Sequence, residues 1–280
     1  MSTKAHLKSL MEKHGLHAQR SLGQCFLIDD NVLRKIALYG LAGKEDTVIE
    51  IGPGLGPLSE ALLEGRKERV GGQQYAIEID KGLVEVLRAE YAERIEIIHH
   101  DATKFDFSTL GVGPFALVGN LPYNVTTPLL LNFLKYKQCF GQTTVMIQKE
   151  VADRLLATPK QKAYGSLTVL FQLHSEMERI MDVSPECFWP QPKVWSTVIQ
   201  IDWRSQLAVP CKDPAFLEKV VRASFAQRRK TLRNSLQSQF SKENVIQLSE
   251  QSEIDLKRRA ETLTLQEFVI LAEQLQVFVS

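Results

Sequence analysis

The segment from Asp46 to Gly72 constrains the fold more than any other part of the sequence. Thr47 to Ile51 (TVIEI) is typical of a buried parallel strand. The glycine-rich run Gly52 to Gly56 follows, and a helical pattern begins at Pro57, a residue suited to the first turn of a helix. Glycines in such a loop let the backbone approach a ligand closely. The segment predicts an α/β sheet with a ligand site at the carboxyl end of this strand.

Two acidic residues continue the same pattern. Glu78 lies near the end of the next predicted strand, Gln74 to Ile79, about 20 residues after the glycines, where a carboxylate can hold a ribose diol. Asp101 follows a third strand, Ile95 to His99, and so lies on the same edge of the sheet. There its carboxylate can accept the amino group of an adenine ring. Together the two acids indicate a nucleotide-type pocket.

Two other interpretations of the glycine run stay open. An NAD-dependent oxidoreductase would have a third glycine where this chain has Pro57, so the run departs from the dinucleotide fingerprint. A tight glycine turn without a ligand is the second alternative. The two later acids favour a pocket over either.

The motif Asn120-Leu121-Pro122-Tyr123 is equally informative. An apolar run from Phe115 to Val118 precedes it and a helical pattern from about Thr127 follows, which places it on a strand-to-helix loop. Pro122 fixes its own φ and pushes Leu121 into an extended conformation, so the loop is stiff. An Asn side chain, a free carbonyl and an aromatic face suit a planar group with N–H hydrogens, such as an exocyclic amine. A helix-capping Asn beside a core Tyr is the alternative.

The length of 280 residues is large for one core, and from about Pro210 the pattern is helical only. We therefore expect a large domain at 1–205 and a small helical domain at 206–280. The composition, 44% hydrophobic and 24% charged, is that of a soluble globular protein. The basic N-terminus lacks the apolar core of a signal peptide, and no apolar run approaches the ~18 residues of a membrane helix. We expect a cytoplasmic protein without membrane association.

Cysteine and histidine usage gives no sign of a metal site. The four cysteines are scattered without a C-x-x-C pair, and the neighbours His99 and His100 would point to opposite faces of a strand. We therefore expect reduced thiols and no metal. The net charge of +1 says nothing about nucleic acid, so local clusters must decide that question.

Two segments far from the glycine run have the composition of pocket walls. Gln19 to Asp29 is a loop with an apolar centre, which would form either a lid over the pocket or an arm packed on the surface. Cys187 to Val194 contains the aromatic pair Phe188 and Trp189, braced by two prolines, which predicts a rigid stacking wall. Packing of Phe188 in the core is the alternative.

The stretch from Arg222 to Arg233 is strongly basic and has no acidic residue. A solvated helix end is the usual meaning of such a run. Beside a pocket with adenine-like features, a phosphate-binding patch is the better interpretation, and Lys257, Arg258 and Arg259 would extend it. The residues expected to contact phosphates are Arg222, Arg228, Arg229, Lys230 and Arg233.

Taken in series, these motifs resemble the class I S-adenosylmethionine-dependent methyltransferases, and more narrowly the bacterial small-subunit ribosomal-RNA adenine N6-dimethyltransferases. The resemblance runs through SLGQCFLID, VIEIGPGLGPLSEAL, AIEID, HDA, GNLPYNVTTPLL, QKEVADRL, KAYGSL, FWPQPKV and FAQRRKTLRNSL. It implies a Rossmann-like sheet with helices on both faces, a small helical RNA-binding domain and S-adenosylmethionine as cofactor. The implied substrate is two adjacent adenosines near the 3′ end of 16S rRNA in the small-subunit precursor. Nothing in the sequence demands more than a monomer.

Carried over position by position, the resemblance assigns the Gly52 loop to the methionine end of the cofactor, Glu78 to the ribose hydroxyls and Asp101 to the adenine N6. Cys25 stands where the family's GQNFL motif usually has Asn, and a thiol is a weak hydrogen-bonding group. Trp195 likewise stands where many relatives have Asp. The residues expected to bind the cofactor are Cys25, Leu27, Gly52, Glu78, Asp101 and Asn120.

The implied reaction needs neither a metal nor a strong base. The side-chain oxygen of Asn120 and the carbonyl of Leu121 would accept the N6 hydrogens and favour a tetrahedral nitrogen whose lone pair points at the methyl group. Tyr123, with Phe188 opposite, would stack the extruded base.

Two rivals share the same fold. A DNA or protein-glutamine N-methyltransferase would have a similar pocket, but the segment FAQRRKTLRNSL argues against it. A non-catalytic ribosome-assembly or nucleic-acid-binding factor would tolerate loss of the NLPY motif or Asp101, and both are intact.

Overall fold

A seven-stranded sheet with the order β4-β3-β2-β5-β6-β9-β7 forms the core of the computed structural model, which describes residues 3–16, 24–67, 72–91 and 93–279. The strands are β2 (Val48–Ile51), β3 (Gln74–Glu78), β4 (Glu96–His99), β5 (Phe115–Asn120), β6 (Phe140–Gln148), β7 (Ser175–Val183) and β9 (Ser196–Trp203). Neighbouring strands from β4 to β6 are parallel, and β9 is antiparallel to β6. The expected α/β sheet is confirmed.

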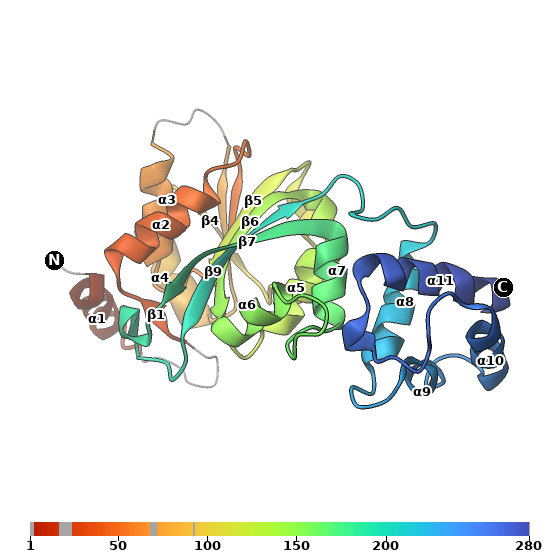
Figure 1. Cartoon of the computed structure of the whole chain (residues 1–280). Coiled ribbons are helices and arrows are strands. Elements are labelled where there is room, and N and C mark those ends of the chain that lie inside the picture. Colours follow the sequence, from red (N-terminus) through yellow and green to blue (C-terminus); the bar gives the residue numbers. More distant parts are fainter. Residues whose placement is uncertain (1–2, 17–23, 68–71, 92, 280) are drawn as a thin grey trace. The chain divides into compact units, whose positions relative to one another are not determined.

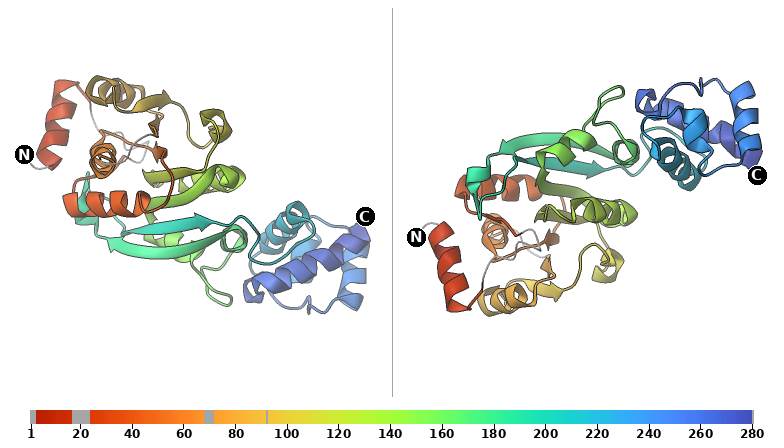
Figure 2. Two further views of the ribbon diagram at one scale, coloured as in Figure 1. Left: turned by 90° about the horizontal axis from the view of Figure 1, so that it is seen from above. Right: turned by 90° about the horizontal axis from the view of Figure 1, so that it is seen from below.

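Helices cover both faces of this sheet (Figures 1 and 2). One face carries α2 (Asp30–Gly40), α3 (Pro57–Gly65) and α4 (Lys81–Tyr91). Alternate residues of β5, Ala116 and Val118, pack there against apolar side chains of α2 and α3. Because successive side chains of a strand point to opposite faces, a strand covered on both sides must be apolar along its covered length, as β5 is from Phe115 to Val118.

The opposite face carries α5 (Thr126–Lys135) over an aromatic cluster. Phe107, Phe133 of α5 and Phe140 of β6 meet edge to face, with ring centroids 5.0 to 6.2 Å apart. Such pairs contribute about 0.5–1.5 kcal/mol each beyond the burial of their area. The cluster fixes the segment between β4 and β5 against the sheet.

The start of α3 shows why glycine is required in the loop after β2. Gly56 has φ +89° and directly precedes the helix, whose first residue is Pro57. A Cβ atom at Gly56 would lie 2.5 Å from the ring of Tyr91 in α4. Only glycine therefore allows α3 and α4 to pack this closely at the carboxyl end of β2.

The chain forms two compact units. One comprises residues 1–152 and 177–203, and the other residues 153–176 and 204–280. The boundary expected after residue 205 lies close to the last crossing between the units, after Trp203. The segment 153–176, which we had assigned to the first domain, instead groups with the helical unit, because α7 (Ser166–His174) packs on its helices.

The helical unit contains, besides α7, the helices α8 (Pro214–Phe225), α9 (Leu232–Leu236), α10 (Lys242–Gln251) and α11 (Leu265–Val279). Phe225 links two of its parts, with ring centroids 6.1 Å from Tyr164 and 5.7 Å from Phe268. The helical pattern expected from Pro210 onward is confirmed. No helix in the described part of the chain is long and apolar enough to cross a bilayer.

Candidate active site

A cavity with about 1180 Å³ of atom-free space, part of it open to solvent, lies at the carboxyl ends of β2 to β5. It is lined by every residue that we expected to bind the cofactor and by three of the four expected catalytic residues, with Phe188 the exception. These lining residues are Cys25, Leu27, Gly52, Glu78, Asp101, Asn120, Leu121 and Tyr123. The fold thus brings together residues that are spread over about a hundred positions of sequence.

The glycine loop has the backbone conformation that a ligand-cradling turn requires. Gly52 and Gly54 have φ values of +64° and +63°, in the left-handed region that other residues avoid. At Gly54 a Cβ atom would also lie 3.0 Å from the ring of Phe26. Both glycines therefore keep the loop backbone exposed to the cavity.

Glu78 is buried, with 6% of its surface exposed, and its carboxylate is tied to the backbone around it. Oε2 accepts the Gly54 N–H at 3.2 Å, and Oε1 accepts the N–H groups of Ile79 and Asp80 at 2.9 and 3.0 Å. Burial raises the pKa of Glu78, while these three hydrogen bonds act in the opposite direction. Oε2 keeps a second lone pair for a hydroxyl group in the cavity.

Asp101 presents an ionised carboxylate at the end of β4. Thr103 donates its N–H and its hydroxyl to Oδ1 at 2.9 and 2.7 Å. Partial burial would raise the pKa of Asp101, but the hydrogen bonds from Thr103 and the charges of Lys104 and His100 outweigh it and lower the pKa. A carboxylate held in this way is a fixed acceptor for an amino group.

Asn120 is the last residue of β5, and its side chain has a defined orientation. Nδ2 donates to the backbone carbonyl of Cys25 at 3.1 Å. The reverse orientation would place two acceptor oxygens against each other, so Oδ1 is the atom left to accept a hydrogen. The N–H of Leu121 donates to the Met146 carbonyl at 3.0 Å, which extends the β5–β6 pairing by one residue into the loop.

Tyr123 is fixed by a residue that the sequence did not indicate. Its hydroxyl lies 2.6 Å from Oγ of Ser196, the fully buried first residue of β9. Burial raises the pKa of Tyr123, and the hydrogen bond to Ser196 opposes that rise. The neutral phenol ring is therefore held at the cavity wall with its polar end occupied.

A short strand covers one side of the cavity. β1 (Phe26–Leu27) pairs antiparallel with β8 (Phe188–Trp189), and Gln24 donates to Asp80 at 2.9 Å. These contacts, with the Asn120 bond to Cys25, hold the described end of the expected lid against the site. The first part of the loop, residues 19–23, lies outside the described residues.

Phe188 and Trp195 do not line the cavity. Phe188 pairs with Leu27 and belongs to the core cluster under α2, with 3% of its surface exposed. The structure thus places Phe188 in the core, as in the alternative interpretation of this segment. Trp195 is 51% exposed and directly precedes Ser196.

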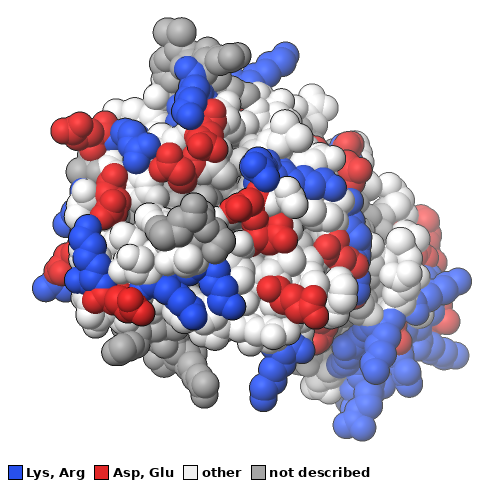
Figure 3. Space-filling view, turned by 90° about the vertical axis from the view of Figure 1, so that its left-hand side faces the viewer, with Lys and Arg blue, Asp and Glu red and all other residues white. Residues whose placement is uncertain are grey.

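The expected phosphate-contacting residues are all exposed, and they lie on and after the end of α8 and in α9. Arg222 forms an ion pair with Glu218 at 2.5 Å. Among the ion pairs of the described residues, none involves Arg228, Arg229, Lys230 or Arg233. Figure 3 shows one face on which acidic and basic side chains mix over much of the surface and Lys and Arg gather in one region, so the low net charge conceals local clustering.

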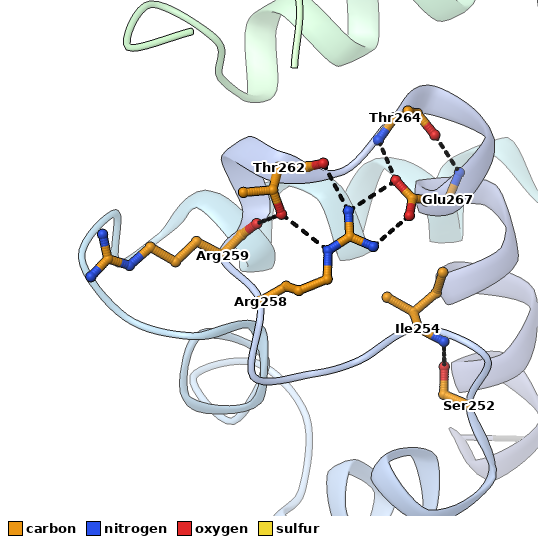
Figure 4. A network of polar contacts seen from close by, with 7 residues as sticks. All are labelled: Ser252, Ile254, Arg258, Arg259, Thr262, Thr264 and Glu267. Atoms are coloured by element: carbon orange, nitrogen blue, oxygen red, sulfur yellow. Dashed lines mark hydrogen bonds and ion pairs between the residues drawn. The ribbon is translucent and has the colours of Figure 1, made fainter. Parts of the chain in front are cut away.

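Arg258 does not extend the basic patch as we expected. Its guanidinium bonds both carboxylate oxygens of Glu267, at 2.5 and 3.2 Å, and both the hydroxyl and the carbonyl of Thr262 (Figure 4). The side chain of Arg259 points away from this network, while its backbone carbonyl accepts from the Thr262 hydroxyl at 2.9 Å (Figure 4). Arg258 is therefore occupied in tying the start of α11 to the preceding loop.

The polar partners of the site residues were not predictable from motifs. Thr103, Ser196 and Gln24 are common residue types, and only the fold brings the last two to Tyr123 and Asp80, which are 73 and 56 positions away in the sequence. Thr103 alone carried a signal, because a Thr two residues after an Asp often donates back to its carboxylate.

The sequence matches the family described as Ribosomal RNA adenine dimethylase over residues 15–276. A protein of Clostridium botulinum (strain Loch Maree / Type A3) named Ribosomal RNA small subunit methyltransferase A is 46% identical, over 95% of this chain and 97% of the relative. A protein of the same name from Geobacillus sp. (strain WCH70) is 41% identical, over 99% of this chain and 98% of the relative.

Two solved structures have the same fold. A dimethyladenosine transferase from Plasmodium falciparum gives a TM-score of 0.71 at 21% identity, covering 91% of this chain and 98% of the other. The 23S rRNA methyltransferase ErmE gives 0.65 at 24% identity, covering 90% and 99%. Since the family match and the two relatives extend over nearly the whole sequence, the chain belongs to the ribosomal RNA adenine dimethylase family.

Proposed function

We propose that this enzyme transfers methyl groups from S-adenosylmethionine to N6 of two adjacent adenosines near the 3′ end of 16S rRNA, giving N6,N6-dimethyladenosine in the small-subunit precursor. The observation that carries the proposal is the orientation of Asn120. Its Nδ2 is bonded to the Cys25 carbonyl, which leaves Oδ1 as an acceptor at the edge of a cavity that also contains Glu78 and Asp101.

The residues of the cavity fit the cofactor. The left-handed glycines at 52 and 54 give the methionine end a close approach to backbone, the free lone pair of Glu78 Oε2 suits a ribose hydroxyl, and ionised Asp101 suits an adenine amino group. Leu27 supplies an apolar cover, and Cys25 contributes its backbone carbonyl to the positioning of Asn120. When bound, S-adenosylmethionine supplies a methyl group already activated by its sulfonium.

The acceptors at the end of β5 prepare the adenine nitrogen for attack. The N6 lone pair of adenine is delocalised into the ring, so the amine is a poor nucleophile. Hydrogen bonds from N6 to Asn120 Oδ1 and to the Leu121 carbonyl favour a tetrahedral nitrogen with a localised lone pair. The same oxygens would stabilise the positive charge that develops on N6 as the new C–N bond forms and the bond from the methyl group to sulfur breaks, which leaves S-adenosylhomocysteine. The methylated nitrogen would then release one proton to solvent.

Tyr123 stacks on the extruded base, because its ring is held at the cavity wall by the bond to Ser196. Phe188 was predicted to stack from the opposite side. Its burial in the core favours an indirect role, in which it supports β1 by pairing with Leu27. After the first methylation one N–H is lost, so the amine must turn before the second.

The RNA is held outside the cavity by charge. Arg228, Arg229, Lys230 and Arg233 are exposed, and their contacts would go to phosphates, which position an RNA without reading its sequence. Selectivity for the two adenosines would then come from RNA shape. We infer that the enzyme acts as a monomer on small-subunit precursors in the cytoplasm.

Transfer of labelled methyl groups from S-adenosylmethionine to small ribosomal subunits that lack the modification tests this function. Nucleoside analysis should find N6,N6-dimethyladenosine in 16S rRNA. Unmodified large subunits serve as the control substrate. A protein that binds both the cofactor and the small subunit, but never labels the RNA, would favour the assembly-factor alternative.

A further inference from the structure

Three buried polar side chains meet beneath the glycine loop. They are Glu50 of β2, Ser59 of α3 and Gln74 of β3, which are 1%, 0% and 3% exposed. In the sheet, Glu50 pairs with Ala76, two residues after Gln74, so Glu50 and Gln74 are diagonal neighbours on one face. Ser59, in the first turns of α3, covers that same face.

The hydrogen bonds among these residues are incomplete. Ser59 Oγ donates to Glu50 Oε2 at 2.5 Å, and Gln74 Nε2 donates to the Ser59 carbonyl at 3.3 Å. Glu50 Oε1 and Gln74 Oε1 are both buried without a partner. Turning the Gln74 amide over would supply a donor to Glu50, but it would set the amide oxygen against the Ser59 carbonyl.

A proton on Glu50 completes the network. An ionised carboxylate only accepts hydrogen bonds, so it cannot bond to the Gln74 oxygen, whereas a carboxylic acid donates one. With the proton on Oε1, Glu50 donates to Gln74, Gln74 donates to the Ser59 carbonyl, and Ser59 donates back to Glu50. These three hydrogen bonds form a closed ring without an unpaired buried polar atom. Each unpaired atom would lower the stability of the fold by about 1–3 kcal/mol.

The electrostatic surroundings agree with this protonation state. Burial raises the pKa of Glu50 to about 8, and the negative charge of Glu78 on β3 acts in the same direction, while the hydrogen bond from Ser59 and the nearby amide of Gln74 oppose it. Tyr91 of α4, on whose pKa Glu50 has an electrostatic effect, donates its hydroxyl to the Gly56 carbonyl at 3.3 Å. Tyr91 is neutral at physiological pH, since burial raises its pKa to about 12.

We propose that Glu50 is a positioning residue for cofactor binding, which as a neutral carboxylic acid joins Ser59 to Gln74 and so fixes the glycine loop that begins two residues later. The proposal rests on the proposed function only in taking S-adenosylmethionine as the ligand of that loop. Glu50 lines the same cavity as the loop. In this role it contributes geometry and no negative charge to the cofactor site.

Substitution of Glu50 by Gln and by Ala tests the proposal through binding of S-adenosylhomocysteine, measured by calorimetry at pH 7. Gln reproduces the donor and the acceptor of a neutral acid, so E50Q should bind within about threefold of wild type. E50A breaks the ring and should weaken binding by about tenfold or more. If Glu50 were instead ionised and attracted the ammonium group of the cofactor, E50Q would lose binding as severely as E50A, which would overturn the proposal.

Thermal unfolding between pH 5 and 8 gives a second readout. With a folded-state pKa of about 8 and an ordinary value of 4.5, the folded state of wild type keeps a proton that the unfolded state releases. Stability from this group is therefore full below pH 4.5 and is lost as the pH rises toward 8. E50Q should lack this decline and gain in melting temperature relative to wild type as the pH rises, and a parallel pH dependence of the two proteins would contradict the proposal.

Neither readout depends on methyl transfer. A protein that passes both tests but does not modify rRNA would refute the proposed function and leave the role of Glu50 intact. Should E50A fail to fold, S59A and Q74L each break the ring elsewhere and should weaken cofactor binding in the same way. Failure of wild type to bind S-adenosylhomocysteine would overturn the proposal for Glu50 as well.

Discussion

At the cavity, the polar groups that we propose take part in the reaction are fixed by neighbours, whereas the cations of the turn between α8 and α9 extend into solvent. Asn120, Asp101 and Tyr123 each have one polar atom held by a partner between 2.6 and 3.1 Å away. Arg228 and Arg229 are exposed, and no ion pair of the described residues involves them. A fixed acceptor can stabilise a developing charge without reorganising, while an exposed cation contributes through salt-sensitive attraction to phosphate.

Loss of the acceptor at the end of β5 should have the largest effect. N120A removes the oxygen that we propose accepts from N6, and it removes the bond to the Cys25 carbonyl. We expect the rate of methyl transfer to fall by about 10²- to 10³-fold, the usual cost of one preorganised stabilising group. Single-turnover assays measure it, with N31A, an exposed position of α2, as the matched control. A change of less than threefold would remove Asn120 from the mechanism.

Loss of Asp101 should act on the cofactor. D101A removes an ionised acceptor, and a hydrogen bond to a charged group contributes about 1.5–3 kcal/mol, which corresponds to an increase of about 10- to 100-fold in the Kd of S-adenosylhomocysteine. Calorimetry measures this Kd, and D106A, a carboxylate outside the cavity with the same bonding to a following hydroxyl, is the matched control. Equal effects of the two substitutions would show that Asp101 acts through loop structure alone.

Arg258 and Arg259 provide a comparison of a paired with an exposed cation inside one segment (Figure 4). R258A should lower the free energy of unfolding at pH 7 by about 1–2 kcal/mol, because it leaves Glu267 without its bidentate partner. R259A should change stability by less than about 0.5 kcal/mol.

The stability contributed by the Arg258–Glu267 pair should also depend on pH. The hydrogen bond from Arg258 lowers the pKa of Glu267 below its ordinary value of 4.5, against the effect of burial. The stability is therefore present above pH 4.5 and is lost as the pH falls through the lowered pKa. The difference between R258A and wild type in urea unfolding should accordingly narrow below pH 4, and a difference that stays constant would contradict this account.

Single changes in the turn should have the smallest effects. K230A should weaken binding to the small subunit by a few-fold and reduce the slope of log K against log salt by about 1. Filter binding over a range of salt concentrations measures both. A slope unchanged in R228A, R229A and K230A alike would show that the turn does not contact phosphates.

The sequence predicted best where a residue acts through its own backbone or its own element. The strands predicted at Gln74 to Ile79 and Ile95 to His99 agree with β3 and β4 to within one residue at each end, and the glycine loop and Asn120 lie where the patterns placed them. The sequence predictions failed where an element or a residue depends on a partner that is distant in the sequence. Strand β7 is mostly polar, and β8 is only two residues long, so neither has a periodicity that indicates a strand.

Dependence on distant partners also explains which predictions about individual residues failed. Phe188 looked like a stacking wall because its neighbours are aromatic and proline, but pairing with Leu27 turns it into the core. Arg258 was predicted to extend the basic patch because of its basic neighbours, but its guanidinium is paired with the Glu267 carboxylate. Ser196 carried no signal, since its role depends on β9 lying next to β6.

The central claim is that the cavity residues act in methyl transfer and the basic turn acts in RNA binding. Single-turnover methylation at varied subunit concentration tests it most directly, in a comparison of N120A with the triple variant R228A/R229A/K230A. The account predicts that N120A lowers the rate at saturation and leaves the concentration for half-saturation within about threefold of wild type. The triple variant should raise that concentration and leave the saturated rate nearly unchanged. Loss of saturated rate in both variants, or a shift in half-saturation in both, would contradict the account.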